Sequence, residues 1–208
     1  MMQAVTNFFK GWWAQILFFV VLVLIYLFVF SGIKISGTSM EPTLLDKQYV
    51  GINHVAKLKR GDVVVFDARK EDPRIQAGKK DYVKRIIGVP GDTVSFSNGN
   101  LYVNGKKVNQ DYLSKSERTD GTAGDFGSHW DLKSLSNTGL WKSEDANTTK
   151  VPANSYFVMG DHRSVSNDGR YYGYISRKHI TGKVVVPFWY SSTVKKYVDQ
   201  QDKDFFAN

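Results

Sequence analysis

The feature that most constrains this chain is a long uncharged, apolar stretch close to its N-terminus. Residues 11–33 contain no charged side chain, and residues 16–30 are apolar throughout. A helix over residues 11–33 would be about 35 Å long, enough to cross a bilayer core of roughly 30 Å. Trp12 and Trp13 stand near its start, where aromatic residues occur at membrane interfaces. The stretch therefore predicts a membrane-spanning helix.

A cleaved signal peptide is the main alternative interpretation of this stretch. The apolar part of such a peptide is shorter and ends in small residues of the Ala-x-Ala kind. Residues 28–34, Phe-Val-Phe-Ser-Gly-Ile-Lys, contain no alanine. We therefore expect a single-pass anchor in the cell membrane over residues 11–33. With the short N-terminal tail inside, we expect a cytoplasmic tail over residues 1–10 and an extracytoplasmic domain over residues 34–208, an orientation that depends more on the family resemblance described below than on charge.

The composition excludes several kinds of chemistry. The 208 residues include no cysteine, so disulfides, cysteine metal sites and a cysteine nucleophile are ruled out. The formal net charge is +8, from 28 lysines and arginines against 20 acidic residues. These charges are scattered along the chain, which favours a solvated surface with weak attraction to membrane lipid. We expect no nucleic-acid partner.

Beyond the apolar stretch the sequence pattern is mostly that of short strands. Runs rich in β-branched and aromatic residues predict strands over residues 49–53, 62–66, 82–88, 93–96, 155–159 and 183–186. Asn98-Gly99 predicts a hairpin turn. Residues 104–150 are polar and too many for a structureless loop, so we expect a small subdomain inserted into a mostly β domain.

Three segments contain residues that could do chemistry. Ser39 lies in Gly37-Thr-Ser-Met-Glu-Pro-Thr-Leu44, a turn-like segment whose backbone N–H groups could receive an oxyanion. An ordinary turn serine is the simpler interpretation of this segment alone.

Lys84 is the second candidate. In a strand it shares a face with Tyr82 and Ile86, because side chains alternate. It is either a surface lysine on an edge strand or a desolvated amine able to act as a base.

The third segment, residues 160–170, reads Gly-Asp-His-Arg-Ser-Val-Ser-Asn-Asp-Gly-Arg. Its acids and arginines could form a buried network of ion pairs or remain solvated. Its oxygens could also bind a cation, but the arginines would repel a metal, so we expect none.

Together and in order, these segments resemble the three conserved boxes of bacterial type I signal peptidases of the Gram-positive type. Ser39-Met-Glu-Pro-Thr-Leu resembles the nucleophile box, and Tyr82-Val-Lys-Arg with Gly-Val-Pro-Gly-Asp resembles the lysine box. Gly160-Asp-x-Arg-x-x-Ser-x-Asp-x-Arg170 resembles the third box. One such motif is a weak signal, and three in order are a specific one.

This resemblance implies a membrane-bound serine endopeptidase that cleaves signal peptides from exported preproteins, without cofactor or metal. Ser39 would be the nucleophile, Lys84 the general base, and Ser166 the group that orients the amine. The structural residues of the third box would be Asp161, Arg163, Asp168 and Arg170. Shallow substrate pockets would be lined by Ile35, Met40, Leu44, Tyr82 and Val83. The implied fold is a mostly β catalytic domain of the signal-peptidase kind.

The chain departs from the family pattern at three positions. Gly37 stands where many relatives have serine, so oxyanion stabilisation would rest on backbone N–H groups, including that of Ser39. His162 and Gly169 replace the usual Asn and Ser.

Other functions remain open alternatives. A non-enzymatic anchored β domain could bind the cell wall or a partner protein. A soluble self-cleaving repressor would need a DNA-binding region, which residues 1–33 cannot supply. A Ser-His-Asp hydrolase would need one of His54, His129, His162 or His179 as its base.

Overall fold

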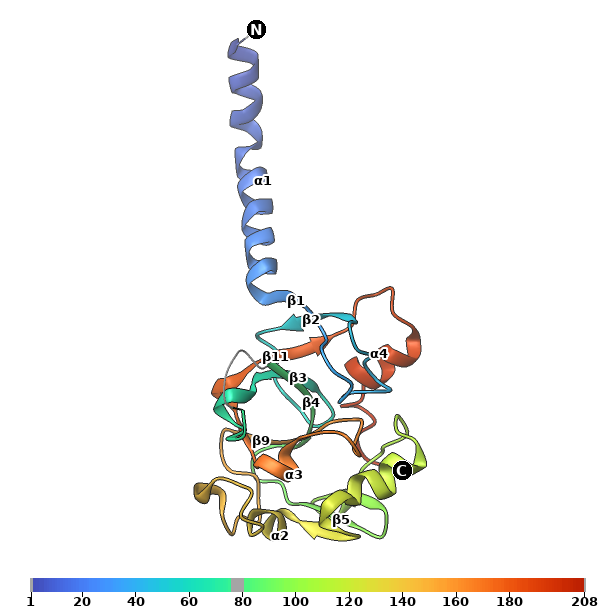
Figure 1. The fold of residues 1–208 in the computed structure, drawn as a ribbon. Helices are drawn as coiled ribbons and strands as arrows, with labels where there is room; N and C mark the ends of the chain where they lie inside the picture. Colours follow the sequence, from blue (N-terminus) through green and yellow to red (C-terminus); the bar gives the residue numbers. More distant parts are fainter. Residues whose placement is uncertain (1, 76–80, 208) are drawn as a thin grey trace.

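A long N-terminal helix stands away from a β-rich body in the computed structural model, which describes residues 2–75 and 81–207 (Figure 1). The helix, α1 (Met2–Val29), ends before the predicted limit of residue 33, and β1 (Phe30–Lys34) follows it. The helix stops there because all five residues of β1 pair antiparallel with the next strand. Within the described parts of the chain, no helix combines the length and apolar character required to cross a membrane.

The main sheet has seven strands in the order β1-β2-β11-β3-β4-β9-β10, and each neighbouring pair is antiparallel. The expectation of a mostly β body is confirmed. Five of these strands, β2, β3, β4, β9 and β11, fall close to predicted ones, whereas β1 and β10 were not predicted. Their bounds are β2 (Tyr49–Asn53), β3 (Val63–Asp67), β4 (Asp81–Gly88), β9 (Ser155–Met159), β10 (Ile175–Ser176) and β11 (Ile180–Val185).

A second sheet of four strands is inserted between β4 and β9, in the order β7-β6-β5-β8. Its strands are β5 (Val94–Ser97), β6 (Asn100–Val103), β7 (Lys106–Lys107) and β8 (His129–Asp131). The turn between β5 and β6 has Asn98 at φ 51° and Gly99 at φ 74°, the backbone that the predicted two-residue hairpin requires. Because β5 pairs with β6 and β8, the insert includes residues ahead of the predicted start at residue 104.

Short helical segments contact strands of both sheets. The α-helices of the body are α2 (Leu132–Ser136), α3 (Gly169–Tyr172) and α4 (Ser192–Asp199). The single-turn elements are η1 (Ala68–Lys70), η2 (Glu117–Gly121), η3 (Gly124–Phe126), η4 (Ser143–Asp145) and η5 (Arg177–His179). A capping box begins α2, in which Asp131 and Ser134 each accept from the other's backbone N–H, at 2.7 and 2.8 Å.

Strand β3 is buried on both faces, and its pairing with β4 positions that strand. Val63 and Val65 pack into one apolar cluster together with the loop after β1, whereas Val64 and Phe66 pack into another on the opposite face. A third cluster fills the insert and reaches the main sheet through Phe157 of β9. Strand β4 pairs residue by residue with β3, which holds its side chains in a fixed register.

Candidate active site

Ser39 lies on a tight turn between β1 and β2. Upstream of it, Gly37 adopts φ 98° and donates its N–H to Asp46 Oδ1 at 2.8 Å. Downstream, the N–H of Glu41 donates to the carbonyl oxygen of Thr38 at 3.0 Å. One bond restrains the backbone before Ser39 and the other restrains it after Ser39, so the turn that carries the serine is well fixed.

Lys84 reaches this corner from β4. The register of β3 and β4 places it opposite Val64, and its side chain is 3% exposed. Its Nζ donates to Ser39 Oγ at 2.7 Å, across 45 residues of sequence. Nζ also lies 5.1 Å from the centre of the Tyr82 ring, on the face that strand alternation predicts. The buried lysine, rather than the surface lysine, is therefore the arrangement present.

Burial changes the proton affinity of this amine. Desolvation lowers the pKa of Lys84 to about 8, and this effect outweighs the opposing attraction of Asp168 and Asp161. An amine with such a pKa is neutral in an appreciable fraction of molecules near pH 8. It can therefore accept the proton of a hydroxyl that lies within hydrogen-bond distance.

Ser39 and Lys84 open onto a cleft of about 250 Å³. The cleft is lined by Ile35, Ser36, Gly37, Thr38, Ser39, Met40, Asp81, Tyr82, Val83, Lys84, Val165 and Asn167. Four of the five predicted pocket residues are among them, and Leu44 is not. The Leu44 side chain is fully buried in the apolar cluster that also contains Val50 and Val63. Val165 and Asn167 line the cleft although no sequence pattern indicated them.

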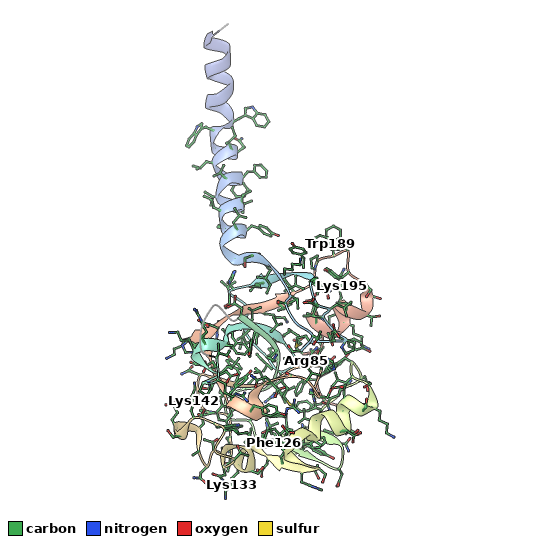
Figure 2. The ribbon with its side chains drawn as sticks, in the orientation of Figure 1. Arg85, Phe126, Lys133, Lys142, Trp189 and Lys195 are labelled. Carbon is green, nitrogen blue, oxygen red and sulfur yellow. The ribbon has the colours of Figure 1, made fainter. Side chains whose placement is uncertain are left out.

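The third box is joined to β4 by a buried ion pair. Arg85 donates from Nε and Nη2 to the two carboxylate oxygens of Asp161, at 2.9 and 2.6 Å, and neither side chain is exposed. Figure 2 places Arg85 inside the body. Arg85 was not among the predicted site residues. Strand alternation was the available signal, because it directs Arg85 away from the face of Lys84.

A second buried pair lies within the third box itself. Arg170 donates to both oxygens of Asp168 at 2.9 and 3.1 Å, and Asp168 also accepts from the N–H of Gly160 at 3.0 Å. Burial alone would raise the pKa of Asp168, but Arg170 and these hydrogen bonds hold it below its usual value. The ionised form of Asp168 is therefore favoured, within a buried ion pair.

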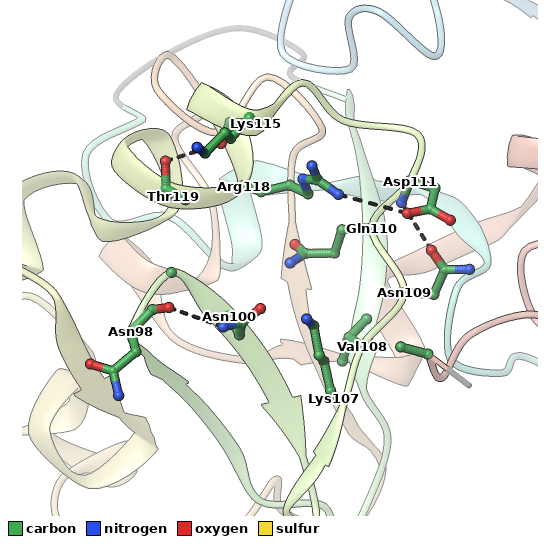
Figure 3. A pocket seen from close by; sticks show the side chains of 12 residues that line it. Asn98, Asn100, Lys107, Val108, Asn109, Gln110, Asp111, Lys115, Arg118 and Thr119 are labelled. Carbon is green, nitrogen blue, oxygen red and sulfur yellow. Dashed lines mark hydrogen bonds and ion pairs between the residues drawn. The ribbon is translucent and has the colours of Figure 1, made fainter.

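Arg163 connects the third box to the insert. Its Nε donates to Gly160 O at 2.8 Å, while Nη1 donates to Gln110 Oε1 at 2.6 Å and to Thr122 Oγ1 at 2.9 Å. Gln110 also lines a polar cleft of about 540 Å³ in the insert, shown in Figure 3. None of the predicted catalytic residues lines that second cleft, so the chemistry is expected at Ser39 and Lys84.

Comparison with known proteins identifies the family. Residues 9–189 match the family model described as signal peptidase, peptidase S26. The chain belongs to the S26 signal peptidase family. Membership of this family makes the chain a peptidase, which removes the alternative of a non-enzymatic binding domain.

Individual relatives of this S26 peptidase cover most of its length. The chain is 40% identical over 184 residues to signal peptidase IB of Staphylococcus aureus (strain COL), covering 85% of this chain and 87% of that relative. It is 38% identical over 170 residues to signal peptidase I of Bacillus caldolyticus, covering 78% and 81%. A crystal structure of a signal peptidase I from Enterococcus faecalis V583 superposes with a TM-score of 0.48 at 30% identity, covering 63% of this chain and 99% of that one.

One expected contact of this S26 peptidase is not formed. Ser166 Oγ is buried and has no hydrogen-bond partner among the described residues, so the predicted bond to Lys84 Nζ is missing. The hydroxyl instead packs against Gly160, where an added Cβ would lie 2.2 Å from Ser166 Oγ and 2.5 Å from Ser39 O. Only glycine at this position lets the segments of Ser39 and Ser166 approach each other so closely.

Proposed function

We propose that this S26 peptidase is a membrane-bound serine endopeptidase that removes signal peptides from exported preproteins. Ser39 is its nucleophile and Lys84 its general base. The observation that carries the proposal is the 2.7 Å contact between Lys84 Nζ and Ser39 Oγ, made by a lysine that is 3% exposed. A desolvated amine in contact with a hydroxyl is the arrangement that Ser/Lys catalysis requires.

The reaction follows from this contact. The neutral amine of Lys84 takes the Ser39 proton as Oγ attacks the carbonyl carbon of the scissile bond. Negative charge then develops on the carbonyl oxygen, beside the Ser39 N–H, which donates to no other group in the described part of the chain. The ammonium of Lys84 returns its proton to the leaving amine. Water then attacks the acyl-enzyme, with Lys84 again taking the proton, and releases Ser39.

The cleft supports a preference for small residues beside the scissile bond. Its volume is about 250 Å³, and Ile35 and Met40, two of its apolar lining residues, are themselves almost fully buried in the core. These two side chains cannot shift to admit a larger substrate residue without disturbing the packing of the core. Small side chains fit there, and signal peptides end in residues of this kind.

An apolar helix surface supports the membrane anchor. The described side chains of residues 12–27 on α1 are all exposed, and most of them are apolar. An apolar surface of this extent is stable only when another apolar medium covers it. Phe188 and Trp189 are also exposed, and Figure 2 shows Trp189 at the end of the body nearest α1. We therefore propose that the apolar part of α1 lies in the membrane, with the body on the extracytoplasmic side.

Processing of a preprotein by the Ser39→Ala variant tests the proposal. We expect cleavage to be abolished while the melting temperature stays unchanged, because a small side chain is lost from a turn. Ser36→Ala is the matched control, since Ser36 lines the same cleft and makes no contact with Lys84 Nζ. Normal processing by Ser39→Ala would overturn the proposal.

A further inference from the structure

His162 makes two contacts with the nucleophile loop. Its backbone N–H donates to Ser39 O at 3.1 Å. Its ring Nδ1 lies 3.2 Å from the carbonyl oxygen of Thr38. A carbonyl oxygen can only accept, so Nδ1 carries the proton and donates it. The turn of the third box therefore binds two consecutive peptides of the loop: the one that joins Thr38 to Ser39, through Thr38 O, and the next one, through Ser39 O.

The orientation of the Thr38–Ser39 peptide matters for the reaction, because it carries the N–H that would stabilise the oxyanion. The carbonyl of Thr38 and the N–H of Ser39 belong to a single planar unit, in which the C=O and N–H point in opposite directions. A bond that holds the Thr38 oxygen therefore also sets the direction of the Ser39 N–H. This N–H has no acceptor in the described residues, and both Thr38 and Ser39 line the catalytic cleft.

We propose that His162 is a positioning residue: its ring N–H orients the peptide whose N–H stabilises the oxyanion. This inference rests on the proposed function and deepens it. His162 acts through Thr38 and makes no contact with Ser39 Oγ or Lys84 Nζ.

The local backbone explains why this peptide needs a second hydrogen bond. Gly37, just upstream, has φ 98°, and no atom lies within 4 Å of the place that a Cβ would take. On that side the loop is therefore held by the bond from Gly37 N–H to Asp46 Oδ1 and not by packing. Thr38 O accepts from Glu41 N at 3.0 Å, and its second lone pair accepts from His162. The two donors, Glu41 N–H and His162 Nδ1–H, together restrain the plane of the Thr38–Ser39 peptide. A single donor would restrain the position of the Thr38 oxygen but less so the tilt of that plane.

Substitutions of His162 test the ring alone, because its backbone bond to Ser39 O survives in each of them. His162→Leu removes the donor, whereas His162→Asn keeps an N–H donor at a similar reach. His54→Leu is the matched control, since the ring of His54 also bonds a backbone carbonyl, that of Thr181 at 3.0 Å, away from the cleft. Cleavage of a signal-peptide substrate by the full chain gives kcat and KM, and thermal unfolding reports folding.

Loss of an oxyanion donor lowers kcat by about 10²–10³, so misdirecting one should cost His162→Leu roughly 10-fold or more. We expect its KM and melting temperature to stay unchanged, and His162→Asn and His54→Leu to remain within about threefold of the parent. A peptide aldehyde that forms a tetrahedral adduct with Ser39 should bind His162→Leu more weakly by the same factor. Binding of the uncleaved peptide should not change.

Several outcomes would overturn the positioning role. They are a parent-like kcat in His162→Leu, an equal loss in His162→Asn, a rise in KM in place of a lower kcat, or a loss that follows a lower melting temperature. Failure of the proposed function is distinguishable, because there Ser39→Ala itself would remain active.

Discussion

Arg85 and Asp161 form a bidentate ion pair that joins strand β4, which carries Lys84, to the turn of the third box. Lys84 precedes Arg85 on β4, and His162 follows Asp161, so each partner is the direct neighbour of a residue at the site. The guanidinium of Arg85 also donates to Gly61 O at 2.7 Å. The Arg85–Asp161 pair thus holds Lys84 in position relative to the third box, although neither partner lines the cleft.

We expect Asp161→Asn to destabilise the fold strongly. The substitution leaves the guanidinium of Arg85 buried without its counter-charge, and breaking a buried pair costs about 3–5 kcal/mol. Urea unfolding of the full chain in detergent measures the change. Asp111→Asn is the control, because the pair of Asp111 with Arg118 is exposed and 3.7 Å long. The two variants should differ clearly, and equal stabilities would contradict the structural role of the Arg85–Asp161 pair.

We expect cleavage to become faster as the pH rises through about 8, the pKa to which burial lowers Lys84. The base must be neutral, so the rate follows the deprotonated fraction of Lys84.

Tyr82→Glu places a carboxylate close to this amine, favours its charged form and should move the rise in rate to higher pH. Tyr82→Gln loses the same ring without adding charge and should not move it. Initial rates across pH decide, and identical profiles for the two variants would count against Lys84 as the base.

Lys84→Arg should be almost inactive at every accessible pH. A guanidinium keeps its proton in this whole range and cannot act as a base. Initial rates of the parent and the variant at pH 7 and pH 9 provide the measurement. If the arginine variant cleaved at the parent rate, the general base would have to be sought elsewhere.

We expect Lys84→Met to be inactive but more stable than the parent at pH 7. Burial lowers the pKa of Lys84 from 10.5 to about 8, so the unfolded chain binds more protons between these two values. The lysine therefore destabilises the fold fully below pH 8, and this cost disappears as the pH rises toward 10.5. The gain at neutral pH should be on the order of 1–3 kcal/mol, shrinking in alkali. Chemical unfolding at pH 7 and pH 10 checks this, with the exposed Lys133→Met as control. A gap that widens with pH would contradict the sign.

Ser166→Ala should separate catalysis from folding. The hydroxyl is buried and unpaired among the described residues, so its removal should leave stability equal or raise it by up to about 1 kcal/mol. The family resemblance gives this hydroxyl the role of orienting the Lys84 amine, and a kcat lowered by about 10-fold or more would assign it that role in the substrate complex. Melting temperature and initial rates are the measurements. Unchanged activity would show that Ser166 has no part in the reaction.

Several features of this chain were predictable because they depend on neighbours in the sequence. The β5–β6 turn is one, since Asn98 and Gly99 accept positive φ at little cost. The strand character of β4 is another. The order of the three boxes indicated Ser39 and Lys84 as partners, and their 2.7 Å contact agrees with that prediction.

Other features required the tertiary structure. Leu44 was predicted to line a pocket but turns into the core, and Arg85 and His162 act through contacts with distant residues, Asp161 and Thr38. No local pattern encodes these pairings, because they arise only when β4 is held between β3 and β9 beside the nucleophile loop.

Which residue types are available, and which faces of the strands they occupy, follows from the order of the amino acids alone. The tertiary structure decided which of them meet and which are removed from water. Lys84 illustrates the division: its position in the lysine box is a property of the sequence, whereas its lowered pKa is a property of the fold. The physical reason is that desolvation depends on everything packed around a group, and that packing is assembled from strands far apart along the chain.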